Sequence, residues 1–91
     1  MPYAEINGKR LFYAPSRSRQ AKAPALVLIH GAGGSHLHWP PQLRRLQEAT
    51  VYALDLPGHG RSDGPGHDHI SDYVTAVIRF LDAVQIDQAV L

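Results

Sequence analysis

The stretch best suited to chemistry is a glycine-rich segment that follows an apolar run. Residues 25–29 are Ala-Leu-Val-Leu-Ile, and residues 30–34 are His-Gly-Ala-Gly-Gly. Glycines let the backbone turn sharply, and small residues let its N–H groups approach a ligand with no side chain in the way. Fixed N–H donors of this kind stabilise negative charge that develops during a reaction. The segment therefore predicts an anion-binding loop where a buried strand ends.

A second segment, residues 55–63, contains a serine in a glycine-rich setting. Residues 60–64 match G-x-S-x-G, the spacing of a nucleophile elbow, in which a strand ends at the motif and a helix follows the serine directly. Here Pro57 breaks the preceding run too early, and glycines and a proline after residue 63 prevent a helix. We therefore expect Ser62, together with Asp55, to hold this loop through hydrogen bonds to backbone N–H groups.

Two other chemistries fit the sequence less well. His36-x-His38 and His67-Asp68-His69 have the spacing of metal-ligand pairs, but zinc needs three or four converging ligands, and these pairs lie in different loops. The glycine segment also resembles a dinucleotide-binding loop with Asp55 as the ribose acid, yet His36 stands where that pattern needs its last glycine. We expect no metal site and no cofactor.

Apolar patterns predict the elements that position these loops. Uninterrupted runs at 25–29 and 50–56 indicate strands buried on both faces. A helix is expected at 40–47, and the clearest one at 70–84, with Asp68 as its N-cap. That helix should bury a stripe of apolar residues at three- and four-residue steps: Ile70, Tyr73, Val74, Val77, Leu81 and Val84.

The two ends of the chain carry weaker patterns. Residues 3–6 and 10–14 should form a β-hairpin around Asn7-Gly8, with the second strand resembling an edge ribbon. Residues 15–24 should be an exposed connection, and residues 89–91 should begin a further strand. Alternation of strands and helices from residue 25 onward predicts an α/β fold with a parallel sheet.

Size and composition limit the class of protein. The 91 residues allow one domain, with 44% apolar and 19% charged residues, as in globular proteins. A net charge of +1 gives no general case for nucleic-acid or membrane binding, and no run approaches the ~20 apolar residues of a membrane span. Residues 9–22 contain five cationic side chains, which we expect to be exposed to solvent and not to form a phosphate-binding patch. Without cysteine or a signal-peptide pattern, we expect a cytoplasmic chain.

Both loop segments resemble signatures of one family. Residues 30–34, with Trp39 after them, are similar to the oxyanion-loop motif of α/β-hydrolase-fold enzymes. Residues 55–63 resemble the Asp-x-Pro-Gly-x-Gly-x-Ser signature of the same family, and the spacing between the two also fits. Two motifs in the right order are far more specific than either alone. The resemblance covers nearly the whole chain.

The resemblance implies a role for each matching residue. The backbone N–H of Ala32 would be one donor of the oxyanion hole, and His30 would order the loop rather than act as a base. Trp39 would lie near the wall of the substrate pocket, although a tryptophan that fills core at a helix start is an equal alternative. The remaining motif residues would support the two loops: Gly31, Gly33, Gly34, Asp55, Gly58, Gly60 and Ser62.

The resemblance also implies that the catalytic triad lies outside these residues. The family's nucleophile follows the strand that begins at Ala89, and its acid and histidine come later. Residues 1–91 would then be the N-terminal segment of an α/β-hydrolase domain, a 1–14 hairpin and a 25–91 βαβα unit in an incomplete three-layer sandwich. The complete enzyme would cleave a small ester-like substrate. Relatives with an aspartate nucleophile instead cleave epoxides or carbon–halogen bonds.

An alternative hypothesis is a non-catalytic, hydrolase-like module. The family's sheet places the strand at 25–29 between the strand at 50–56 and the one that begins at Ala89. Without a full neighbour, that apolar edge favours pairing with another chain. We therefore expect self-association of the isolated chain.

Overall fold

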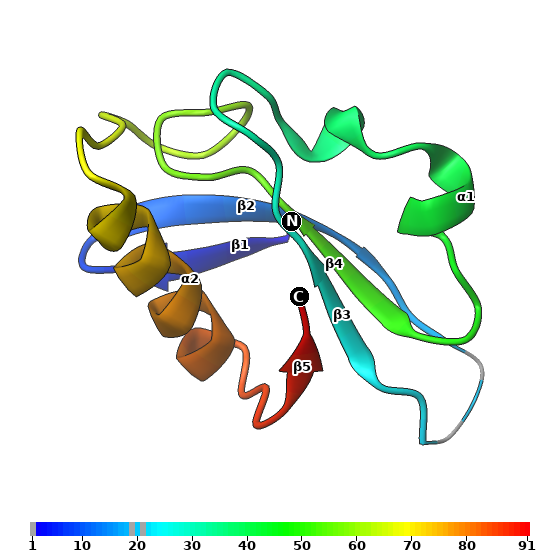
Figure 1. Cartoon of the computed structure of the whole chain (residues 1–91). Coiled ribbons are helices and arrows are strands. Elements are labelled where there is room, and N and C mark those ends of the chain that lie inside the picture. The colour runs from blue at the N-terminus through cyan, green and yellow to red at the C-terminus, as the bar shows by residue number, and fades with distance from the viewer. Residues whose placement is uncertain (1, 19, 21) are drawn as a thin grey trace.

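The computed structural model describes residues 2–18, 20 and 22–91. Across them the chain forms a five-stranded mixed sheet with the strand order β1-β2-β4-β3-β5 (Figure 1). A 3-10 helix, η1 (His36–His38), and two α-helices, α1 (Pro41–Arg44) and α2 (Ile70–Ala83), connect the later strands. The strands, in chain order, are Tyr3–Ile6, Lys9–Ser16, Ala25–Leu28, Thr50–Leu54 and Ala89–Val90.

The predicted hairpin is confirmed, but its second strand lies inside the sheet. Asn7 and Gly8 both have positive φ, +50° and +78°, as a tight two-residue turn requires. β2 pairs with β1 on one side and runs antiparallel to β4 on the other, where Pro15 faces Tyr52. This second pairing extends β2 to Ser16, beyond the predicted end at residue 14. The expectation of an edge ribbon is therefore wrong for β2, because β1 is the outer strand.

The parallel part of the sheet is confirmed. β3 runs parallel to β4 from the Ala25–Thr50 pair to the Leu28–Ala53 pair, and its other side pairs with β5. β3 therefore lies between β4 and β5, as the family resemblance implied. β4 ends at Leu54, two residues before the predicted end, because the backbone at residue 55 turns into the loop that follows.

The helices differ from prediction mainly at their ends. α1 covers four residues instead of the eight expected at 40–47, whereas α2 matches the predicted helix to within one residue. The N-cap of α2 is His69, with no capping bond from its side chain, so the prediction of Asp68 as N-cap is wrong. None of the described helices is long and apolar enough to cross a lipid bilayer.

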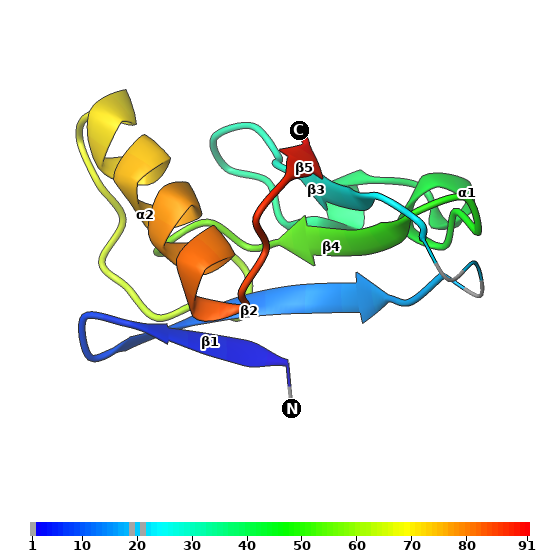
Figure 2. The same cartoon turned by 90° about the horizontal axis from the view of Figure 1, so that it is seen from below.

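The core is divided between the two faces of the sheet. On the face covered by α2, Phe80 and Val77 pack with Val27 of β3 and Leu54 of β4. On the opposite face, Leu43 of α1 packs against a cluster that contains Leu28, Ala49, Val51 and Ala53. Figures 1 and 2 show α2 lying over the hairpin side of the sheet, while α1 lies beside β4.

The predicted buried stripe of α2 is only partly buried. Val77 is buried as expected, but Ile70 and Val74 are 82% and 51% exposed, and Ile78 is 53% exposed. The buried residues of the helix are Ala76, Val77 and Phe80. The apolar residues of α2 extend around more than one face, and within the described chain only the face with Phe80 meets the sheet.

This asymmetry predicts different stability effects on the two faces of α2. Phe80→Ala should lower the free energy of unfolding by about 3–5 kcal/mol, because it empties a fully buried aromatic position. The matched change Ile78→Ala, two residues earlier on the exposed face, should change it by less than about 0.5 kcal/mol. Urea unfolding followed by circular dichroism measures both. Equal effects would contradict the assignment of the buried face.

Candidate functional site

Two loops meet at the carboxyl end of the parallel strands. The glycine loop, residues 29–35, follows β3, and the second loop, residues 55–69, follows β4. Both lie at the same end of the sheet, near the top of Figure 1. This is the end where open α/β sheets bind ligands, because the loops after neighbouring parallel strands come together there.

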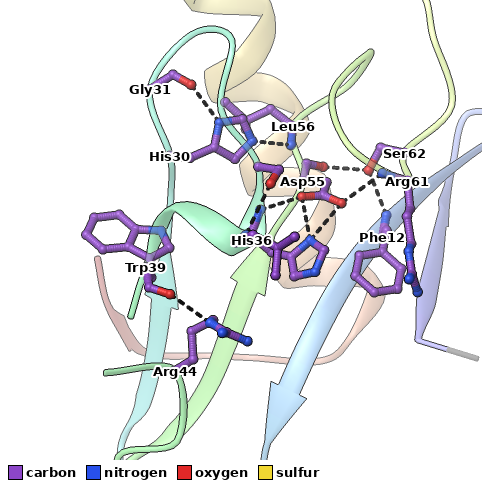
Figure 3. Close-up of polar contacts among 12 residues, drawn as sticks. Phe12, His30, Gly31, His36, Trp39, Arg44, Asp55, Leu56, Arg61 and Ser62 are labelled. Carbon is purple, nitrogen blue, oxygen red and sulfur yellow. Dashed lines mark hydrogen bonds and ion pairs between the residues drawn. The ribbon is translucent and has the colours of Figure 1, made fainter. Parts of the chain in front are cut away.

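A buried carboxylate joins the two loops. Asp55 is 0% exposed, and its oxygens accept the backbone N–H groups of His36, at 2.5 Å, and Arg61, at 2.8 Å. The His36 ring faces the same carboxylate, with Nδ1 at 2.9 and 3.0 Å from its two oxygens (Figure 3). Removing a carboxylate from water is costly unless hydrogen bonds replace the lost solvation. These donors therefore fix the position of both loops.

Two motif glycines shape the second loop. Gly60 has φ +50°, and a Cβ there would overlap the Asp55 carboxylate, so the backbone must pass the carboxylate without a side chain. The N–H of Gly58 donates to the Asp63 carbonyl at 3.0 Å and closes the loop. Together they let the chain turn tightly enough for Arg61 to reach Asp55.

Ser62 connects the second loop to the hairpin. Its Oγ accepts the Phe12 N–H at 2.8 Å and donates to the Asp55 carbonyl at 2.5 Å (Figure 3). The neighbouring Asp63 accepts the Arg10 N–H at 2.9 Å and forms an ion pair with its guanidinium at 3.5 Å. The Ser62 hydroxyl proton is thus directed to a carbonyl, so this serine is not held as a nucleophile beside a base.

The glycine loop is held by a histidine. His30 is 4% exposed, and its Nε2 accepts the Leu56 N–H at 3.0 Å, while Nδ1 donates to the Gly31 carbonyl at 2.7 Å. The Gly34 N–H donates to the same carbonyl at 3.0 Å. His30 therefore bridges the two loops through backbone groups and orders the turn that begins at Gly31.

Several amides of the glycine loop have no acceptor among the described residues, and the Ala32 amide is one of them. The Gly33 N–H donates to His59 Nε2 at 3.1 Å, and the Gly34 N–H donates within the loop. For the Ala32 N–H, directly before Gly33 in the sequence, the described part of the chain provides no acceptor, and the same holds for the N–H groups of Gly31 and Ser35. Ala32 is exposed, so its N–H can reach solvent or a ligand.

Trp39 lies apart from the loop contacts. Its carbonyl accepts the Arg44 Nε–H at 2.7 Å (Figure 3). Its ring packs against the core cluster that contains Leu28 and Ala53. The indole Nε1 is buried and has no hydrogen-bond partner among the described residues. Its packing fits the core-filling alternative, and its place in a substrate pocket stays a prediction.

A cavity of about 340 Å³ lies between the hairpin turn, the second loop and α2. Lys9, Arg10 and Arg79 contribute cations to its lining, and Asp63 and Asp72 contribute acids. None of the motif residues predicted for the site lines this cavity. It is therefore separate from the glycine loop and gives that loop no substrate pocket.

Sequence reasoning missed the partners that cross between loops. The sequence suggests no contact between His36 and Asp55, which pair in the structure, and it gives no role to His59, which accepts the Gly33 N–H. In the other histidine pair, His67 stacks edge-on against Tyr73 of α2. The one available signal was that Asp55 lies between an apolar strand and a loop, where a buried acid needs a nearby donor.

Comparisons with known proteins agree on one family. A family model described as "Alpha/beta hydrolase family" matches residues 26–91. The dihydrolipoyllysine-residue acetyltransferase component of an acetoin cleaving system from Cupriavidus necator is 36% identical over 89 residues, which are 96% of this chain and 23% of that protein.

Solved structures give the same result. The enol-lactonase from Burkholderia xenovorans LB400 matches with a TM-score of 0.83 and 32% identity, over 97% of this chain and 35% of that enzyme. An enantioselective mutant of the epoxide hydrolase from Aspergillus niger matches with a TM-score of 0.73 and 25% identity, over 90% of this chain and 24% of that enzyme. The chain thus spans between 23% and 35% of the length of these three proteins.

The contact between the second loop and the hairpin predicts a pH dependence. The Arg10 backbone N–H, helped by the Arg10 side chain, lowers the pKa of Asp63 from its ordinary value of 3.8. A carboxyl whose pKa is lower in the folded state stabilises the fold above its unfolded pKa and loses that contribution as pH falls through the folded pKa.

Asp63→Asn should therefore reduce the free energy of unfolding at neutral pH. The difference from the unmodified chain should shrink as the pH is lowered below 3.8. Urea unfolding at several pH values measures this difference, with Asp82→Asn on α2 as the control for loss of one negative charge. A difference that stays constant with pH would show that the ion pair does not titrate as described.

Proposed function

This chain belongs to the alpha/beta hydrolase family, and on that premise we propose that it forms the oxyanion-loop portion of an enzyme that cleaves ester or related acyl bonds. The proposed nucleophile is a serine in polypeptide outside these 91 residues. The reaction needs no metal or organic cofactor. A cytoplasmic location is part of the proposal and is supported by the absence of cysteine.

The available amide of Ala32 carries this proposal. When a nucleophile attacks an acyl carbon, the carbonyl oxygen becomes an anion, and each fixed N–H donor that meets it is worth roughly 3–4 kcal/mol. The donor must be held still before the reaction occurs. His30, Asp55 and His59 hold the backbone on both sides of Ala32, while the Ala32 N–H itself has no acceptor among the described residues.

The two serines of the loop region, Ser35 and Ser62, are not placed to act as nucleophiles, which supports a nucleophile in polypeptide outside these 91 residues. Ser62 donates to a carbonyl, and Ser35 Oγ accepts the Leu37 N–H at 3.1 Å at the start of η1. Neither contacts a histidine ring in the described part of the structure. The match to the enol-lactonase favours an acyl substrate. The match to the epoxide hydrolase makes an epoxide the second candidate substrate class.

The proposal predicts that the 91-residue chain alone forms no acyl-enzyme. Incubation with a fluorophosphonate probe should give no covalent adduct by intact-mass spectrometry, and an activated ester should be hydrolysed no faster than in buffer. Ser62→Ala, which removes the serine of the G-x-S-x-G pattern, is the matched control and should behave identically. An adduct that is lost in Ser62→Ala would make Ser62 a nucleophile and contradict the proposal.

A second candidate function, a self-associating module without catalysis, is supported by the open edge of the sheet. β5 pairs with β3 only at Ala25–Ala89 and Leu26–Val90, so the later residues of β3 are paired with β4 on one side and have no strand on the other side in the described chain. Val90 and Leu91 are 56% and 72% exposed at this edge. Unpaired strand edges favour pairing with another chain.

Self-association through this edge predicts a concentration-dependent increase in sedimentation coefficient. Val90→Lys should shift the chain toward monomer, because a charge on an edge strand opposes pairing. Leu37→Lys, at an equally exposed position in η1, is the control and should leave the association unchanged. A chain that sediments as a monomer at every concentration would exclude this second function.

A further inference from the structure

Two histidines form a reciprocal connection between the loops. His30 comes from the glycine loop and accepts the Leu56 N–H of the second loop at 3.0 Å. His59 comes from the second loop and accepts the Gly33 N–H of the glycine loop at 3.1 Å. The two rings lie against each other, with their centroids 5.0 Å apart. Each loop thus supplies an imidazole that fixes the backbone of the other.

The partners of these rings determine their protonation. A backbone N–H can only donate, so Nε2 of each ring must carry no hydrogen. A backbone carbonyl can only accept, and His59 Nδ1 lies 3.0 Å from the Pro57 carbonyl, while His30 Nδ1 lies 2.7 Å from the Gly31 carbonyl. Both rings are therefore assigned as neutral, with the hydrogen on Nδ1.

A second proton on His59 would remove the acceptor for Gly33. Both nitrogens of an imidazolium are donors, so Nε2–H would then face the Gly33 N–H at hydrogen-bond distance. His59 is half-buried, whereas His30 is 4% exposed, so solvent reaches His59 more easily.

The surroundings of His59 contain other titratable groups. The His30 ring lies on one side, and Tyr73 of α2 lies on another with its centroid at 6.1 Å. The His67 ring packs against the Tyr73 ring, with their centroids 5.1 Å apart. The Asp55 carboxylate, near the base of the same loop, is occupied by His36 and Arg61, and it forms no hydrogen bond with His59 in the described structure.

We infer that His59 is a positioning residue that holds the glycine loop while its imidazole is neutral and releases Gly33 when the imidazole is protonated. Gly33 directly follows Ala32, so this release loosens the backbone next to the proposed oxyanion donor. The consequence for catalysis rests on the proposed function, but the pH-dependent contact between His59 and Gly33 does not.

Nuclear magnetic resonance of the ¹⁵N-labelled 91-residue chain tests this contact directly. The scalar coupling across the hydrogen bond between the Gly33 amide nitrogen and His59 Nε2 should be present while the ring is neutral and lost once the ring is protonated, as read from the ring's own ¹⁵N shifts. Its loss should share one midpoint with protonation of the His59 ring. Absence of the coupling at high pH, or its survival after the ring is protonated, would overturn the inference.

Two variants distinguish the effect of the hydrogen-bond acceptor on His59 from the effect of its aromatic ring. His59→Gln supplies an uncharged acceptor, so the Gly33 amide shift should no longer change with pH. His59→Phe keeps a ring beside His30 but supplies no acceptor, so exchange of the Gly33 amide hydrogen should accelerate at all pH values. His67→Gln is the matched control and should keep the titration of the unmodified chain. If either His59 variant fails to fold, the coupling in the unmodified chain still decides the question.

These measurements use no substrate, so they are independent of the proposed function. A coupling that titrates as expected, in a chain for which the Ala32 donor is later excluded, would support His59 as a loop-positioning residue and reject only the catalytic role. A missing coupling would reject the positioning role and leave the Ala32 proposal to its own test.

Discussion

The buried carboxylate of Asp55 is the constraint on which the arrangement of the loops depends. A fully buried charge must be surrounded by donors, and here the donors are two backbone N–H groups and one imidazole. They come from residue 36, at the start of η1 directly after the glycine loop, and from residue 61 of the second loop, so these contacts fix the relative position of the two loops. Leaving a buried polar group without one of its hydrogen bonds typically costs about 1–3 kcal/mol. The requirement for glycine at residue 60 has the same origin, because the backbone must pass close to the carboxylate.

This constraint acts through the parallel strands. Because β3 and β4 run in the same direction, the glycine loop and the second loop begin side by side, and the histidines need to span only a short gap. Ser62 and Asp63 extend the network to the hairpin, so β1 and β2 support the loops as well as the sheet. The result is a turn whose Gly31 carbonyl and whose Gly33 and Gly34 N–H groups are engaged, while the Ala32 N–H is available. Such preorganised donors stabilise an oxyanion without reorganisation during the reaction.

Much of the fold could be predicted because its signals are local. The Asn7-Gly8 turn, the apolar runs of β3 and β4 and the periodicity of α2 lie within short windows of sequence, and the structure has all of them. The predictions were wrong where contacts between distant segments determine the end of a strand or the exposure of a side chain. β2 extends because β4 pairs with it, and Ile70 is exposed because the described sheet meets only the Phe80 face of α2. The site shows the same division: motif residues could be identified from spacing, but His36 pairs with an acid 19 positions away, which periodicity does not reveal.

The second loop holds the glycine loop through His30 and His59, and the Ala32 amide stays free for an anion. Amide hydrogen exchange, resolved residue by residue, tests this most directly. We expect the Ala32 N–H to exchange within about tenfold of the unfolded-chain rate, and the Gly34, His36 and Leu56 N–H groups to exchange at least about a hundredfold more slowly. An Ala32 amide protected as strongly as those three would mean that it already has an acceptor, and the proposed oxyanion donor would be wrong.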